Sequence, residues 1–126
     1  TAVETAEANG RYVAAHCHAD RAILDCVRSG VRTIEHATYL SEGTVEVLRE
    51  TPETYLVPPF AAMYLLQTEP KARAFWLARL TPMLESCAAA IEKAYRAGEK
   101  IGFGTDSAPM SKQYEQGVEF QYRKDY

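Results

Sequence analysis

The sequence predicts an α/β fold in which parallel strands alternate with helices. Apolar runs of strand length at residues 11–16, 31–36, 54–60 and 100–107 are separated by segments with helical spacing of their apolar residues. Such strands need crossover connections, because parallel neighbours cannot be joined by tight hairpins. With 126 residues, 47% of them hydrophobic, we expect a single domain over residues 1–126, either half of a barrel or an open sheet.

Glycines and a serine delimit the first three predicted helices. The first is expected to end at Gly10 and the second, which begins at Asp20, at Gly30, because glycine readily adopts the left-handed conformation that ends helices. Ser41 is a typical N-cap for the third helix. We expect that helix to end before Pro52, which marks the turn into the next strand.

The later elements carry weaker signals. A short helical turn is expected around residues 61–66, followed by an apolar stripe from Leu77 to Tyr95. Thr81 and Pro82 look like an N-cap and a first-turn proline, so a break or kink is expected there, with a restart that runs to Gly98. Residues 108–117 are expected to be loop, and no closing element is expected after them.

Composition excludes several classes of partner. Fourteen Lys and Arg against seventeen Asp and Glu give a net charge of −3, and no basic stripe is present for nucleic acid or an anionic membrane. No stretch approaches the roughly 18 apolar residues of a spanning helix, and no basic segment precedes an apolar core at the start. We therefore expect a soluble, cytoplasmic protein, whose three cysteines, without a CxxC, are reduced.

Metal-capable side chains end three of the four predicted strands. His16, His36 and Asp106 occupy these positions, and functional residues of parallel α/β sheets gather at the carboxyl ends of the strands. Neutral imidazoles suit zinc and similar divalent ions, while an aspartate can bind the metal and take a proton from its water. The metal would lower the pKa of that water towards about 7. The sequence thus predicts a metal site of these three residues, with Asp106 also catalytic.

Strand alternation extends this prediction to the faces of the sheet. If the three strand-end residues point into a barrel interior, small residues share that face and leave room at its mouth. The predicted inward set is Ala14, Ile34, Gly102 and Gly104, and the predicted outward set is Val13, Ala15, Thr33, Glu35, Ile101 and Phe103. Glu35 would then need a buried partner.

Further polar residues near the strand ends have both a functional and an ordinary interpretation. His18 is expected to contact substrate or support the ligands, although the pair with His16 could be a polar turn. Tyr39 and Tyr64 follow the second and third strands and could contact substrate or simply pack. Cys17 could be a nucleophile, but alternation points it away from His16.

Two other catalytic motifs fit poorly. Asp106 and Ser107 suggest a Ser–His–Asp triad, yet no G-x-S-x-G turn is present to hold a serine. The run "GFGTD" is not a G-x-G-x-x-G that opens a helix, so dinucleotide binding is disfavoured.

Taken together, these residues resemble the metal-dependent amidohydrolase superfamily, and in particular its imidazolonepropionase-like branch, which includes prolidase-type dipeptidases. The matching text is "VAAHCHADRAILDCVRSGVRTIEHATYLSEGTVEVL", "TYLVPPF" and "IGFGTDS". The resemblance covers residues 10–108, and the ordered set H-x-H, I-E-H and G-T-D is much more specific than any of its parts.

The resemblance implies a partial TIM-type (β/α)8 barrel, roughly strands five to eight with their helices. It implies that His16 and His36 are metal ligands and that Asp106 is both a ligand and the general base. The family commonly has glycine where Ala19 stands and threonine where Pro59 stands. Both departures touch loops that contact substrate.

The family's other H-x-H and its strand-four lysine would lie before residue 1. We therefore expect the chain to supply half of a binuclear site and either to associate with itself or to need the missing amino-terminal half of the barrel. The expected function is that of a hydrolase fragment that activates water to cleave an amide, in a dipeptide or an N-acyl amino acid. The alternative is a catalytically silent α/β domain that serves structure or assembly.

Overall fold

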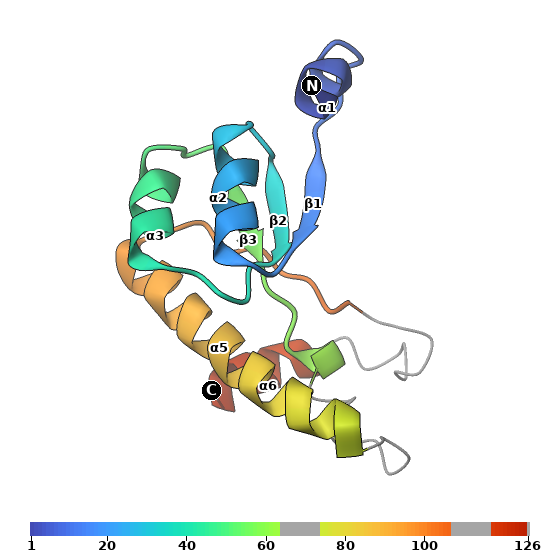
Figure 1. Cartoon of the computed structure of the whole chain (residues 1–126), viewed down its shortest axis with the longest axis vertical. Coiled ribbons are helices and arrows are strands. Elements are labelled where there is room, and N and C mark those ends of the chain that lie inside the picture. The colour runs from blue at the N-terminus through green and yellow to red at the C-terminus, as the bar shows by residue number, and fades with distance from the viewer. Residues whose placement is uncertain (64–73, 107–116, 126) are drawn as a thin grey trace.

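The structure is a computed structural model that describes residues 1–63, 74–106 and 117–125. Three parallel strands form one sheet in the order β1-β2-β3, and helices connect them (Figure 1). The elements are α1 (Ala2–Glu7), β1 (Ala14–Cys17), α2 (Asp20–Arg28), β2 (Thr33–His36), α3 (Glu42–Arg49), β3 (Tyr55–Val57), α5 (Ala74–Ala97) and α6 (Val118–Asp125).

The main core lies between the sheet and the helices α2, α3 and α5. Ile34 and Leu56 face this core from neighbouring strands and are almost wholly buried. Ile23 of α2 and Leu48 of α3 belong to the same core cluster, and Figure 1 shows these two helices against the sheet. Burial of each such apolar side chain stabilises the folded protein by roughly 1.5–3 kcal/mol. The helix-covered face of the sheet therefore contributes more to stability than the open face.

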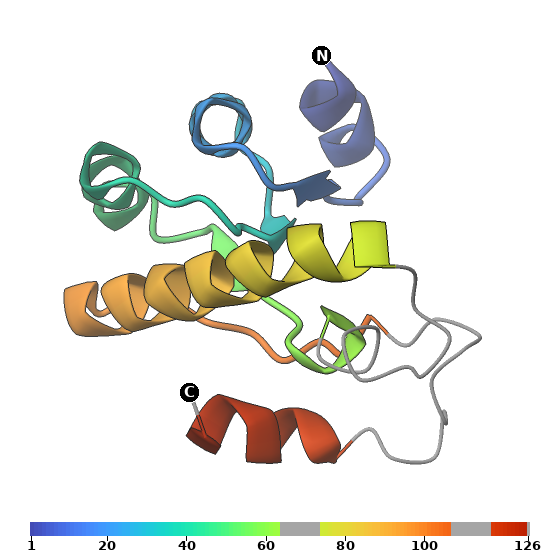
Figure 2. The ribbon, with the colours of Figure 1, turned by 60° about the horizontal axis from the view of Figure 1, so that its bottom comes forward.

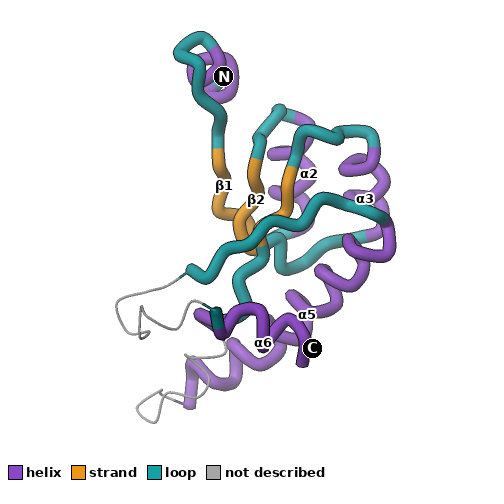
Figure 3. The backbone as a smooth tube through the Cα atoms, turned by 180° about the vertical axis from the view of Figure 1, so that it is seen from behind, coloured by secondary structure: helices purple, strands orange, loops and turns teal. Residues whose placement is uncertain are grey.

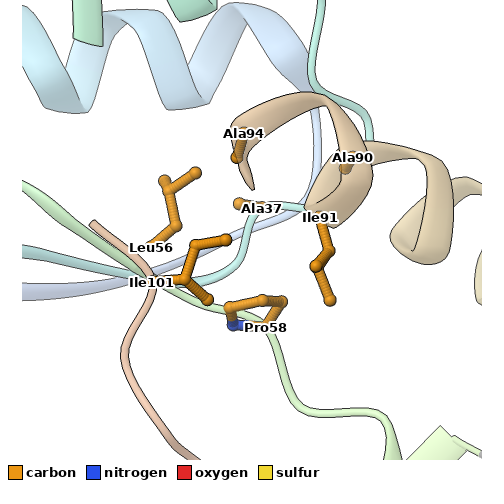
Figure 4. Close-up of a pocket in the computed structure, with 7 residues that line it drawn as sticks. All are labelled: Ala37, Leu56, Pro58, Ala90, Ile91, Ala94 and Ile101. Atoms are coloured by element: carbon orange, nitrogen blue, oxygen red, sulfur yellow. The ribbon is translucent and has the colours of Figure 1, made fainter. Parts of the chain in front are cut away.

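The carboxyl-terminal half of α5 closes the core with small residues. Ala90 and Ala94 of α5 approach Leu56, Pro58 and Ile101, and a narrow apolar cavity of about 10 Å³ remains between them (Figure 4). This is about the room of one water molecule, but a water needs polar partners. The small side chains of α5 therefore allow its close contact with β3.

The opposite face of the sheet carries no helix among the described residues (Figure 3). The register pairs His16 with Glu35, and Glu35 with Val57, so these three residues share the open face. The inward prediction was wrong for Ile34, which faces the helices, and the outward prediction was wrong for Thr33 and Glu35. Apolar Ile34 faces the buried helix layer. Polar Thr33 and Glu35 lie on the open face instead, where the Thr33 hydroxyl donates to Glu35 Oε1 at 2.8 Å.

Local signals at the helix ends are confirmed. Gly10 and Gly30 have φ of 64° and 81°, in the left-handed region that glycine adopts without strain. The Ser41 side chain accepts a hydrogen bond from the Thr44 N–H at 3.2 Å and caps α3.

The predicted helix break at Thr81 and Pro82 is wrong, because α5 continues through both residues. Thr81 is not an N-cap: its hydroxyl donates to the Leu77 carbonyl at 3.2 Å, within the helix. Proline removes one helical hydrogen bond, but buried Leu80 and Leu84 anchor the helix on both sides of Pro82. Packing therefore overrides the local signal.

The fourth predicted strand is also wrong as a strand. Residues 101–106 lie beside β3 but make a single parallel bridge, between Leu56 and Ile101. Residues 118–125, where we expected no closing element, form α6. The loop prediction over residues 108–116 and part of the predicted turn at 61–66 lie outside the described residues, although residues 61–63 are helical.

Among the residues that the structure describes, every helix is too short or too polar to cross a lipid bilayer.

Candidate metal centre

All three histidines of the chain meet at the carboxyl ends of β1 and β2. The ring centroids of His16 and His36 lie 4.4 Å apart, those of His16 and His18 4.7 Å, and those of His18 and His36 4.6 Å. One nitrogen of each ring lies within 4.8 Å of the others, a spacing that a single metal ion could bridge. The convergence of His16 and His36, predicted from their strand ends, is therefore observed, and His18 joins them.

The backbone turn at the end of β2 brings His36 to this cluster. The register pairs His36 with Cys17, whose side chain faces the helix layer, so alternation alone would place His36 on the opposite face from His16. His36 and Ala37 instead adopt φ of 73° and 46°, in the left-handed region that side chains rarely occupy. This turn redirects the His36 ring, and strand alternation does not predict it.

The electrostatic surroundings keep two of the imidazoles neutral. Burial, and then the neighbouring His18 and His16, lower the pKa of His36 below its ordinary value of 6.5, while the charge of Asp106 opposes this shift. Burial and His16 likewise lower the pKa of His18. Neutral imidazole is the form that binds divalent ions, so both rings are ready ligands at neutral pH.

His36 also has an unused nitrogen. Its side chain is only 8% exposed, and Nδ1 is buried with no hydrogen-bond partner among the described residues. A buried polar atom without a partner is costly, and a ligand at this position would relieve that cost. Three convergent imidazoles with an unpartnered nitrogen fit a divalent metal ion.

Buried Thr38 fixes the ring of His18. The Thr38 side chain is inaccessible to solvent, and its Oγ1 lies 2.8 Å from His18 Nδ1. Nδ1 is therefore engaged, and Nε2 is the nitrogen left for another ligand. This role of Thr38 was not predicted from the sequence, although its hydroxyl stands two residues after the strand-end His36.

Tyr39, predicted to contact substrate, lies next to the cluster. Its backbone N–H donates to the His18 carbonyl at 3.0 Å, and its side chain is 44% exposed. Tyr64 and Ser107 lie outside the described residues.

Asp106 lies in the segment beside β3 and is not one of the residues whose ligand atoms group within 4.8 Å of one another. Its negative charge acts on both His18 and His36. The approach needs glycine, because a Cβ on Gly104 would lie 2.7 Å from Val57 Cγ1. Asp106 itself has a φ of 47°, so this segment also turns through left-handed backbone at the site.

Cys17 takes no part in the cluster. It is 6% exposed in the helix-side core, as alternation predicted. Burial, and then Cys26, raise its pKa to about 11, so the thiol stays protonated at neutral pH. A thiolate nucleophile is therefore disfavoured.

Comparison with known proteins also points to a hydrolase family. Residues 1–122 match the Amidohydrolase family. The chain is 30% identical over 109 residues to ochratoxinase of Aspergillus niger, an alignment that covers 85% of this chain and 22% of that protein. The chain thus spans about a fifth of the length of the curated relative it matches.

Solved structures give the same result. The crystal structure of A. niger ochratoxinase matches 95% of this chain with a TM-score of 0.79 and 27% identity, over 27% of its own length. A Xaa-Pro dipeptidase with methionine bound in its active site matches 98% with a TM-score of 0.83 and 27% identity. A prolidase complexed with N-methylphosphonate-L-proline matches 96% with a TM-score of 0.75 and 29% identity. The chain covers 31% of each of the latter two structures.

Proposed function

This chain belongs to the amidohydrolase family, and from that premise we propose that it is the carboxyl-terminal part of a metal-dependent hydrolase barrel that cleaves an amide bond. Its three parallel strands match about a third of TIM-barrel structures of the family. In this proposal they are strands five to seven, and residues 101–106 stand in the place of strand eight.

His16, His36 and Asp106 would hold the divalent ion, which we take to be zinc. The unpartnered Nδ1 of His36 and the neutral imidazoles support this assignment. His18 would face the substrate instead, because Thr38 engages its Nδ1 and orients the ring so that Nε2 is the free nitrogen. Tyr39, half exposed beside His18, would contact the substrate as well.

When bound, the ion would supply Lewis acidity, which polarises an amide carbonyl and lowers the pKa of water towards neutral pH. The Asp106 carboxylate would accept the proton of the attacking water and pass it to the leaving nitrogen, as a general base and then a general acid. The charge of Asp106 acts on His18 and His36, which supports a place for this carboxylate near the site.

The relatives suggest the substrate class. One structure is a Xaa-Pro dipeptidase with bound methionine, and another is a prolidase complexed with a phosphonate of proline. For this chain we propose a dipeptide or an N-acyl amino acid. The chain covers 31% of those proteins, so hydrolysis would require the rest of a barrel, from a longer chain or from association.

The histidine cluster is the observation that carries this proposal, and metal binding tests it. The purified chain is expected to bind about one zinc, and His36→Ala is expected to lower the affinity by at least about 100-fold, because a ligand matters more than the supporting residues that cost 10–100-fold. Asp25→Asn, an exposed carboxylate on α2, is the matched control and should bind like the wild type.

A second candidate, a silent domain that serves structure or assembly, is favoured by the chain's having only three histidines. The same measurement separates the two. If the wild type and His36→Ala carry the same negligible zinc, the hydrolase proposal fails and the silent domain remains.

A further inference from the structure

The sheet ladder between β3 and residues 101–106 stops at a proline. The Leu56 N–H donates to the Lys100 carbonyl at 2.9 Å, and the Gly102 N–H donates to the Leu56 carbonyl at 2.7 Å. In a parallel ladder, the next rung would join the N–H of residue 58 to the Gly102 carbonyl. Residue 58 is proline, which has no N–H to donate.

The guanidinium of Arg123 occupies the position of the missing rung. Its Nη1 donates to the Gly102 carbonyl at 3.1 Å, and its Nη2 donates to the Pro58 carbonyl at 2.8 Å. The planar fork of an arginine can bridge two carbonyls in this way, whereas a lysine ammonium cannot reproduce its geometry. A side chain of α6 therefore joins two backbone segments where the sheet cannot.

Glu119 orients this arginine. Its carboxylate is inaccessible to solvent and accepts from Arg123 Nε at 2.7 Å, one helical turn away. The same carboxylate accepts from the backbone N–H groups of Phe60 at 2.9 Å and Ala61 at 2.7 Å. A buried charge persists when it is paired and hydrogen-bonded, and here its partners tie α6 to the loop after β3.

Aromatic contacts hold the same segment. Phe103 stacks on Phe120 of α6, with ring centroids 4.4 Å apart and an interplanar angle of 22°. Arg123 also lies over the Phe103 ring, 5.7 Å from its centroid. Residues 101–106, drawn in orange, run between α5 and α6 in Figure 2, so α6 is the element that faces this segment from the side away from α5.

We propose that Arg123, oriented by Glu119, is a positioning residue of the candidate metal centre, which fixes residues 101–106 against β3 and thereby sets the place of Asp106. Neither Arg123 nor Glu119 touches the histidines, so their action passes through the backbone of the segment. The inference rests on the proposed role of Asp106 as a metal ligand.

The test is a double-substitution cycle with zinc alone as the probe. Arg123→Lys keeps the charge opposite Glu119 but loses the fork, and it is expected to weaken zinc binding roughly 10-fold, the range found for residues that support metal ligands. In an Asp106→Asn background the same substitution should cause no further loss. Arg96→Lys, at an exposed ion pair on α5, is the matched control and should leave the affinity unchanged.

Amide hydrogen exchange in the metal-free chain keeps the inference separate from the proposed function. Arg123→Lys should speed exchange at residues 102–106 at least roughly 10-fold while β1 and β2 keep their rates, because local opening reports local stability. Glu119→Gln, which keeps an acceptor for the Phe60 N–H, should act in the same direction. Unchanged exchange in this segment overturns the positioning role.

Zinc binding separates the remaining outcomes. An equal loss of zinc affinity with and without Asp106 also overturns the inference, because the effect would then be general. Wild-type binding by Asp106→Asn contradicts the ligand role of Asp106 instead, and with it the link from Arg123 to the metal.

Discussion

Left-handed backbone at non-glycine residues is concentrated at the candidate metal centre. Among the described residues, His36, Ala37 and Asp106 are the non-glycine residues with positive φ. Each such conformation costs of the order of 1–3 kcal/mol and persists only where the surrounding structure enforces it. The strained backbone of the fold therefore lies at His36 and Asp106, two of the residues predicted to bind metal.

Asp20 is a second residue whose role depends on a tertiary contact. Its Oδ1 accepts from the Ser41 N–H at 2.8 Å, which links the first turn of α2 to the N-cap of α3. Burial, the largest single influence, acts to raise the pKa of Asp20, but hydrogen bonds from Ser41 and Thr44 together outweigh it and lower the pKa below 3.8.

We predict that Asp20→Asn lowers the free energy of unfolding by about 1 kcal/mol at pH 7. Because the pKa is lower in the folded state than in the unfolded state, the ionised form contributes stability above about pH 3.8, and this is lost as the pH falls through the folded value. Urea unfolding should therefore show the difference between wild type and variant shrinking below pH 3.8. An equal difference at pH 7 and pH 2 would contradict this; Asp25→Asn is the control.

At the scale of elements, α5 shows how packing decides what local signals leave open. Thr81 and Pro82 predicted a break or kink followed by a restart, and the helix runs without a break from Ala74 to Ala97. The Ser86 hydroxyl donates to the Pro82 carbonyl at 2.8 Å, within the same continuous helix. One lost backbone hydrogen bond is small beside the burial of Leu80 and Leu84 on either side.

Pro82→Ala is predicted to raise the free energy of unfolding by about 1–3 kcal/mol, because alanine restores the helical N–H and removes the ring's clash with the preceding turn. Pro82 is exposed, so no core packing is lost. Thermal or urea unfolding measures the change. Pro52→Ala, in the turn after α3, should instead have little effect or lower stability slightly. A loss of stability in Pro82→Ala would show that the turn before residue 82 is not helical.

At the scale of the whole molecule, the sheet is covered on one side only. Helices cover the face of Ile34 and Leu56, whereas the face of His16 and Glu35 carries no described helix. The outer edge of β1 also has no neighbouring strand in the described sheet. Uncovered edges and faces favour association with another chain.

We predict that the isolated chain self-associates. Sedimentation velocity should give a species heavier than the 14.1 kDa monomer, with a concentration dependence. Ala14→Lys places a charge on the exposed edge strand and should shift the equilibrium towards the monomer, while Ala89→Lys, at an exposed position of α5, should not. A stable, compact wild-type monomer would argue against the half-barrel proposal.

Local patterns predicted much of the fold. The strands β1, β2 and β3, the helices α2 and α3, the glycine ends at Gly10 and Gly30 and the Ser41 cap all follow from short-range signals. The prediction of a fourth strand was wrong and α6 was missed for one connected reason. Pro58 interrupts the ladder, and Arg123 of α6, distant in sequence, supplies its hydrogen bonds.

The sequence by itself determined that His16, His36 and Asp106 stand at the carboxyl ends of parallel segments, because chain order and element type fix which end of a sheet a residue reaches. Only the tertiary structure decided how they face one another. Left-handed backbone at His36 and Asp106, and the hydrogen bond between Thr38 and His18, depend on contacts between segments far apart in the chain. Alternation assumes extended backbone, which neither His36, the last residue of β2, nor Asp106 adopts.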